Sequence, residues 1–238
     1  MAVESKEEAG GGSSRNSLRA LEIWRRAAIL RKTSKSSSSS RGSLPSPLKG
    51  GTLIDDTYNT PKGYASLCRA VFEDYSGRSI LPKINKAIGR TNVVVGGWRC
   101  QKKNICTREI TYTAPQSEKT GGAYQTYESQ TISNPIDGVC LVDATVRTPS
   151  VPYGTRFATR VRYVIQSSGN IDTGNEASVE KISPKKDSEH KSKMVVSFDT
   201  MWTNGRPVLA PAIKRAIRKQ ISKNFKIIDN VIQANTKL

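Results

Sequence analysis

The spacing of apolar and polar positions predicts helices at both ends of a β-rich region. Apolar residues recur at helical spacing up to Tyr75, which predicts a helix capped by Thr60 with Pro61 at its first position. A second short helix is expected over Ile80–Ile88, with Gly89 ending it. The domain therefore begins with two short helices.

After residue 92 the apolar period drops to two, the period of a strand with one buried face. We expect strands at residues 93–98, 106–112, 124–132, 139–146, 157–165 and 194–202. Residues 167–192 are polar and predict a long exposed hairpin loop. Strands joined in this order favour one antiparallel sheet of about six or seven strands.

The last part of the sequence predicts a long helix from Pro211 to Gln233. Its apolar residues share one side of the helix: Ile213, Ala216, Ile217, Ile221, Ile227, Ile228, Val231 and Ile232. Such a broad apolar face needs a wide surface to lie on, usually a sheet, and the helix is on the order of 35 Å long. The order of elements predicts an α+β domain in which one curved sheet grips one helix. A helix lying alone on a membrane surface is the alternative.

Residues 1–52 have the composition of a disordered basic tail rich in Ser and Gly, so we place the folded domain at residues 53–238. Within the tail, Leu and Ile side chains around Trp24 form an amphipathic patch at residues 18–30, surrounded by arginines. This composition is typical of a membrane-interface or partner-binding helix. A transient helix without a partner fits equally well.

Charge favours an anionic partner. The chain has 38 Lys and Arg against 20 Asp and Glu, and its formal net charge is +18. Nucleic acid, an acidic membrane and an acidic protein all fit, as does a charge that only aids solubility. The sequence contains no RNP, KH or zinc-finger pattern, so nucleic acid is not the expected partner.

Residues suited to catalysis or metal binding are sparse. His190 is the only histidine and lies in the polar loop, and no G-x-S-x-G, P-loop or H-E-x-x-H motif occurs. The four cysteines form no C-x-x-C pair, and we expect them to be reduced core residues of a cytosolic protein. The sequence therefore predicts no enzyme, no metal and no cofactor.

One stretch is more specific than all these patterns. Residues 148–157 read TPSVPYGTRF, which resembles the TPDVPYGDxF signature of the VASt domain, a relative of the StAR-related lipid-transfer domains that is called Aster in animals. Three further stretches resemble family motifs in the same order: REITYTAP at 108–115, YESQ at 127–130 and VSFDTMWTNG at 196–205. Together they cover about residues 60–235. Asp199 and Asn204 stand where the family usually has Lys.

The resemblance implies a helix-grip fold with an apolar cavity for one lipid, typically a sterol, as the bound ligand. It also implies a cytoplasmic, non-enzymatic protein that exchanges lipid at membranes, often where the endoplasmic reticulum contacts another membrane. We expect such a protein to contact anionic membranes only peripherally. The sequence contains no apolar run of 18 residues, so no membrane-spanning helix is predicted.

Two groups of candidate residues follow. The cavity candidates are the apolar strand and helix positions Trp98, Ile110, Tyr112, Phe157, Val161, Tyr163, Phe198, Trp202, Ile213, Ile217 and Ile221. The membrane-facing candidates are the basic helix positions Arg215, Arg218, Lys219, Lys223 and Lys226. Each group has a plain alternative, because core packing needs apolar side chains and a helix needs a solvated face. A membrane or protein adaptor with a filled cavity is therefore the first alternative function, and a basic nucleic-acid-binding protein is the second.

Overall fold

A computed structural model describes residues 44–60, 63–73, 79–102, 105–115, 122–134, 138–168, 191–203 and 205–236. Three of the predictions lie wholly or mostly outside these residues. They are the disordered tail of residues 1–52, of which only 44–52 are described, the tail helix at 18–30, and the loop of residues 167–192, of which 169–190 with His190 are not described.

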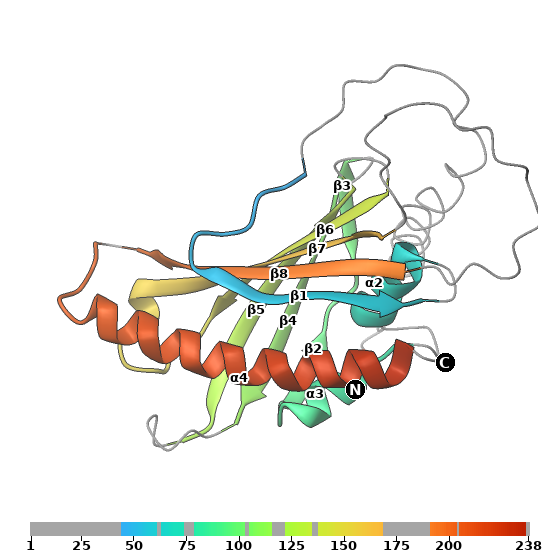
Figure 1. The fold of residues 1–238 in the computed structure, drawn as a ribbon. Coiled ribbons are helices and arrows are strands. Elements are labelled where there is room, and N and C mark those ends of the chain that lie inside the picture. Colours follow the sequence, from blue (N-terminus) through green and yellow to red (C-terminus); the bar gives the residue numbers. More distant parts are fainter. Residues whose placement is uncertain are drawn as a thin grey trace, which may run out of the picture.

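Within the described residues, eight strands form one antiparallel sheet that curves around a long helix (Figure 1). The strands are β1 (Gly51–Asn59), β2 (Thr91–Val95), β3 (Arg99–Lys102), β4 (Ile105–Ala114), β5 (Tyr124–Ser133), β6 (Val139–Arg147), β7 (Phe157–Ser167) and β8 (Lys191–Trp202). Their order is β1-β8-β7-β6-β5-β4-β2, and β3 pairs with β4 beside β2. The α+β class with a curved antiparallel sheet is thus confirmed, and β1 and β3 are the strands that the sequence pattern did not reveal.

Three helices accompany the sheet in the described part of the chain: α2 (Tyr64–Phe72), α3 (Leu81–Ala87) and α4 (Ala210–Thr236). Helix α3 confirms the predicted second helix, and Gly89 follows it with a positive φ of 74°. Helix α2 begins after Gly63, later than predicted, and Thr60 does not cap it. The Thr60 hydroxyl instead lies 2.7 Å from that of Ser192, which ties the end of β1 to β8.

Helix α4 lies along the sheet beside β1 and β8, and its last turns pack near α3 (Figure 1). Phe225, Ile228 and Ile232 are buried in the main core. Polar contacts fix the same half of the helix, because Tyr58 of β1 donates a hydrogen bond to Asp229. Burial of three large apolar side chains stabilises this docking by roughly 6 kcal/mol.

All four cysteines are paired, so the prediction of reduced core cysteines is wrong. Cys68 of α2 bonds to Cys140 of β6, and Cys100 bonds to Cys106. The second pair faces itself across the β3–β4 ladder, with Cα atoms 4.0 Å apart. The positions of the cysteines along the sequence do not reveal the register between β3 and β4 or how α2 lies on β6. The two cysteine pairs were therefore not apparent from the sequence.

On the outer face of the sheet, Asp143 of β6 is held between two arginines of β7. Arg162 Nε donates to Asp143 Oδ1 at 2.8 Å, and Arg160 Nη2 donates to Oδ2 at 2.8 Å. Burial acts to raise the pKa of Asp143, but the hydrogen bonds from Arg162 and Arg160 outweigh it and hold the pKa below its ordinary value. Arg162 also donates to the carbonyl oxygen of Ser46 at 3.2 Å, which ties down the segment before β1.

We expect Asp143→Asn to lower the free energy of unfolding by about 2 kcal/mol at pH 7, because the arginines lose a charged acceptor. A lowered pKa in the folded state stabilises the protein above the unfolded pKa, near 4, and this contribution disappears as the pH falls through the folded pKa. The difference between wild type and variant should therefore shrink between pH 7 and pH 3, measured by urea unfolding.

The control is Asp55→Asn. The Asp55 carboxylate lies 2.8 Å from Lys193 Nζ, and the Asp55 side chain is 55% exposed. It should cost no more than about 0.5 kcal/mol. A difference for Asp143→Asn that stays constant with pH would contradict ionisation as its cause.

Candidate functional site: the concave face of the sheet

The side chains that face α4 come from alternate positions of the strands. On β4 these are Cys106, Arg108, Ile110 and Tyr112, all buried. The β4–β5 register sets Arg108 opposite Gln130 and Ile110 opposite Glu128. Charged and polar residues therefore stand at inward positions of two neighbouring strands.

These residues form a polar band, which we define as Arg90, Arg108, Glu128 and Gln130. Arg108 Nε donates to Gln130 Oε1 at 2.8 Å, and Gln130 Nε2 donates to Glu128 Oε1 at 2.6 Å. Arg90 Nη2 lies 3.5 Å from Glu128 Oε2. Arg108, Glu128 and Gln130 are only 2–3% exposed, so their charges and amides depend on one another rather than on water.

Aromatic rings flank both arginines of the polar band. The Arg90 guanidinium lies 3.8 Å from the centre of the Tyr112 ring, and that of Arg108 lies 4.4 Å from the Trp98 ring. Burial raises the pKa of the Tyr112 hydroxyl well above its usual range, so Tyr112 stays neutral. Burial acts to lower the pKa of Arg90, but Tyr112 and Glu128 raise it on balance, so Arg90 stays charged.

The polar band separates two apolar clusters. Along β4, Cys106 belongs to the main core, Arg108 to the band, and Ile110 to a second cluster with Tyr112 and Ala114. The concave face is therefore apolar on both sides of a charged strip. Such a surface suits a mostly apolar molecule that carries a polar group.

Some buried polar atoms on this side have no hydrogen-bond partner among the described residues. They are the Trp98 indole nitrogen Nε1 and the hydroxyl oxygens of Thr126 and Thr200. An unsatisfied buried group costs about 1–3 kcal/mol, and a water molecule or the polar group of a ligand would remove that cost.

Of the eight residues predicted on strands for the cavity, seven lie on β4, β7 and β8 on the concave side, and Trp98 is buried in the connection between β2 and β3. Trp98, Val161 and Phe198 belong to the main core, and Tyr163 packs against it between the rings of Phe72 and Phe225. The remaining four form two further groups: Ile110 with Tyr112 in the second cluster, and Phe157 with Trp202, whose rings are 5.9 Å apart.

The three predicted helix residues occupy the outer end of one apolar stripe on α4. Ile213, Ile217 and Ile221 are spaced four residues apart, and the stripe continues through Phe225, Ile228 and Ile232. The last three are at most 8% exposed, whereas Ile213, Ile217 and Ile221 are only half-buried. The stripe is thus fully covered at its C-terminal end and partly open to solvent at its N-terminal end.

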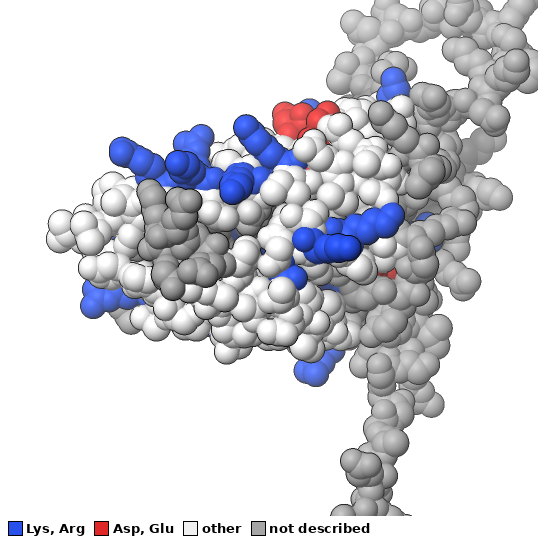
Figure 2. All heavy atoms as spheres, turned by 90° about the horizontal axis from the view of Figure 1, so that it is seen from below, with Lys and Arg blue, Asp and Glu red and all other residues white. Residues whose placement is uncertain are grey.

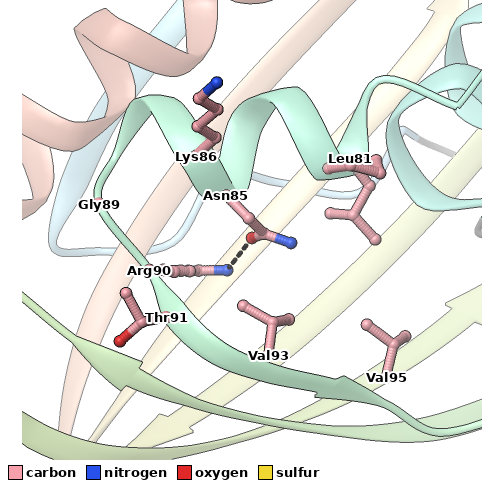
Figure 3. A pocket seen from close by; sticks show the side chains of 9 residues that line it. Leu81, Asn85, Lys86, Gly89, Arg90, Thr91, Val93 and Val95 are labelled. Atoms are coloured by element: carbon pink, nitrogen blue, oxygen red, sulfur yellow. Dashed lines mark hydrogen bonds between the residues drawn. The ribbon is translucent and has the colours of Figure 1, made fainter.

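A hollow of about 570 Å³ lies between α3 and β2 (Figure 3). Leu81, Pro82, Asn85, Lys86, Gly89, Arg90, Thr91, Val93 and Val95 line it. Figure 3 shows Arg90 pointing toward Asn85, whose Oδ1 accepts a hydrogen bond from Arg90 Nη1 at 3.3 Å. The hollow therefore reaches the polar band at Arg90, and none of the predicted cavity residues lines it.

The sequence predictions did not single out the polar band. Its signal was charged residues at inward positions of strands whose other inward positions are apolar, as at Arg108 on β4. The buried Asn85 on α3 left a similar signal, a polar residue among the apolar side chains of a short helix.

The five basic residues predicted to face a membrane, Arg215, Arg218, Lys219, Lys223 and Lys226, are all exposed on α4. From below, Lys and Arg side chains lie along the upper left edge, near the middle of this face and at its lower edge, and little acidic surface is visible (Figure 2). Among the described residues, no helix is long and apolar enough to cross a membrane. The same residues contain no group of three or more His, Cys, Asp or Glu that could hold a metal ion.

A curved antiparallel sheet closed by one long helix defines an α+β domain of the helix-grip type. The chain matches the family model VASt, described as VAD1 Analog of StAR-related lipid transfer domain, over residues 53–224. It belongs to this family of domains related to lipid transfer, as residues 148–157 predicted.

Curated relatives agree with this assignment. Protein Aster-A of Mus musculus is 32% identical over 158 residues, 63% of this chain and 21% of the relative. Protein Aster-A of Rattus norvegicus is 31% identical over 169 residues, 68% of this chain and 23% of the relative. A C2 and GRAM domain-containing protein of Arabidopsis thaliana is 22% identical over 193 residues, 81% of this chain and 17% of the relative. The chain thus spans about a fifth of the length of these relatives.

Proposed function

We propose that the protein binds one lipid molecule of sterol size between α4 and the concave face of the sheet, and carries it between membranes without catalysing a reaction. Family membership supports lipid as the class of ligand. The observation that carries the proposal is the half-buried N-terminal end of the α4 stripe, where Ile213 and Ile217 remain accessible. A bound apolar molecule would complete their burial, which stabilises a complex by about 25 cal/mol per Å² of apolar surface.

The polar band supports a ligand that is not a pure hydrocarbon. A lone hydroxyl, as on a sterol, would find unpartnered buried hydroxyls at Thr126 and Thr200, and Arg90, Glu128 and Gln130 in the adjoining band. A full charge on the ligand would have to be removed from water at much greater cost. A mostly apolar ligand with one weakly polar group is the best match.

The exposed basic residues of α4 support the proposal that lipid is exchanged where the protein contacts anionic membranes peripherally. Arg215, Arg218 and Lys219 stand on the same half of α4 as Ile213 and Ile217. Each basic side chain near an anionic leaflet contributes about 1 kcal/mol of attraction. The membranes would then be approached from the cytoplasm, including sites where two membranes lie close together.

We expect Ile217→Glu to weaken binding of a fluorescent sterol by about tenfold or more, because it puts a carboxylate into the open end of the stripe. The measurement is a titration of the full chain, with the thermal melting curve recorded alongside. Since Ile217 is only half-buried, the melting temperature should change little.

Ala216→Glu is the matched control, because it puts the same carboxylate on the same helix at the exposed neighbouring position. It should bind sterol as the wild type does. Equal sterol affinities of the two variants would mean that the ligand binds elsewhere. A folded wild-type protein that neither binds sterol nor co-purifies with lipid would favour an adaptor with a filled cavity.

A further inference from the structure

The connection between β8 and α4 exposes two large apolar side chains in succession. Val208 is 97% exposed and Leu209 is 50% exposed. They form the middle of a turn closed by a hydrogen bond from Ala210 N to Pro207 O at 2.9 Å, and α4 begins directly behind them. Adjacent exposed apolar residues on an ordered turn are typical of a surface that meets a partner.

A second connection ends at the same edge of the sheet. Residues 148–156 join β6 to β7 and expose Tyr153, which is 43% accessible and has a φ of 62°. Two hydrogen bonds join the connections, from Thr203 N to Arg156 O at 2.8 Å and from Thr203 Oγ1 to Thr155 O at 3.2 Å. Tyr153, Val208 and Leu209 therefore lie at one end of the molecule, and we name them the apolar tip.

Basic residues surround the apolar tip. Arg156 and Arg206 are exposed within the two connections, and Arg215 and Arg218 follow on the first turns of α4. Within residues 147–156 and 199–219 the only acidic residue is Asp199, which lies 3.8 Å from Lys214. Figure 2 shows this end, at the left, as an uncharged point with Lys and Arg on both sides.

We propose that the apolar tip inserts into the interface of an anionic lipid bilayer, with the surrounding arginines contacting lipid phosphates. Apolar residues at the boundary between headgroups and acyl chains, with basic residues at headgroup level, are the pattern by which peripheral proteins bind acidic membranes. The tip shares Arg215 and Arg218 with the basic face of α4, but its apolar residues Val208 and Leu209 precede that helix.

This inference rests on the proposed function, because the membrane contact would serve lipid exchange. It adds which end of the molecule contacts the membrane. Ile213 begins the half-buried stripe about one turn after Leu209, and Ile213 N donates a hydrogen bond to Leu209 O at 3.0 Å. A lipid leaving a bilayer at the tip would therefore reach the open end of the stripe without crossing bulk water.

The test is co-sedimentation of the full chain with vesicles of phosphatidylcholine alone and of phosphatidylcholine with one fifth phosphatidylserine. Wild-type protein should bind the acidic vesicles, and Val208→Asp should bind them about tenfold more weakly. The control is Val94→Asp, which makes the same change of charge at a 65% exposed valine on β2 and should bind as the wild type does. Since both valines are exposed, both variants should keep the wild-type melting temperature.

A sterol titration in the absence of vesicles separates this inference from the proposed function. Normal sterol affinity of Val208→Asp together with lost vesicle binding supports the apolar tip. Equal vesicle binding by Val208→Asp and Val94→Asp, or a wild type that binds sterol but no acidic vesicle, overturns it and leaves the tip to a protein partner. Vesicle binding that depends on Val208 in a protein without sterol affinity would keep the tip and refute the sterol cavity.

Discussion

Replacing Glu128 with alanine is expected to lower the free energy of unfolding by about 3–5 kcal/mol. Glu128 is 3% exposed, accepts a hydrogen bond from Gln130 and faces Arg90 at 3.5 Å. Without it, the polar band contains two arginines and no carboxylate, and the attraction that offsets their burial disappears. Urea unfolding at pH 7 measures the loss.

Two variants make the result specific to the buried charge. Glu109→Ala removes the same side chain from the exposed outer face of β4 and should change stability by no more than about 0.5 kcal/mol. Glu128→Gln keeps an acceptor for Gln130 and removes only the charge, so its loss should be smaller than that of Glu128→Ala. Equal losses for Glu128→Ala and Glu109→Ala would show that the band does not stabilise the fold.

Gly154→Ala should cost roughly 3 kcal/mol, because the new methyl group has no room. A Cβ atom at this position would stand 1.9 Å from the carbonyl oxygen of Thr148 and 2.9 Å from its carbon, both backbone atoms. The turn would have to open, which strains its hydrogen bonds from Val151 N to Thr148 O and from Gly154 N to Val151 O.

Gly97→Ala is the matched control, since a Cβ atom there meets nothing within 4 Å. It should change the free energy of unfolding by less than about 1 kcal/mol, in either direction. If thermal melting found the two alanine variants equally stable, the short distance between residue 154 and the Thr148 carbonyl could not be the reason that position 154 requires glycine.

The Gly154 turn shows how far a motif can be interpreted without coordinates. The stretch TPSVPYGTRF identified the family, and a glycine in such a turn predicts a backbone conformation that a side chain would hinder. The residue with a left-handed backbone is Tyr153, whereas Gly154 is needed for close approach to Thr148. A sequence pattern marks such a turn but does not distinguish these two causes.

Long elements with a strong apolar period were predictable, and edge elements were not. Helix α4 and strands β4 to β8 appear near their expected positions because each buries a continuous apolar face. Strand β1 was missed because only Ile54 and Tyr58 are buried in it, and Asp55, Asp56 and Thr57 interrupt the pattern. Its partner β8 supplies most of the apolar surface at that edge.

At the candidate site, the apolar positions that face α4 followed from the sequence pattern, and the polar band did not. Period-two alternation placed seven of the eight strand candidates on the concave face of the sheet, whereas Trp98 lies between β2 and β3. The alternation also placed Arg108 on this face, but only the register between β4 and β5 shows that Gln130 and Glu128 complete its network. The disulfide between Cys68 and Cys140 depends likewise on how α2 lies over β6.

The pairing of β1 with β8 also affects how the protein is made. Residues of β1 bond to residues of β8 that follow more than 130 positions later in the chain. At about 5–20 residues per second on the ribosome, β1 waits on the order of ten seconds before its partner is synthesised. During that time its backbone groups and the apolar side chains of Ile54 and Tyr58 have no strand to pair with. Closure of the sheet at β1 is therefore a late step of folding, and the nascent chain needs protection from aggregation until β8 has emerged.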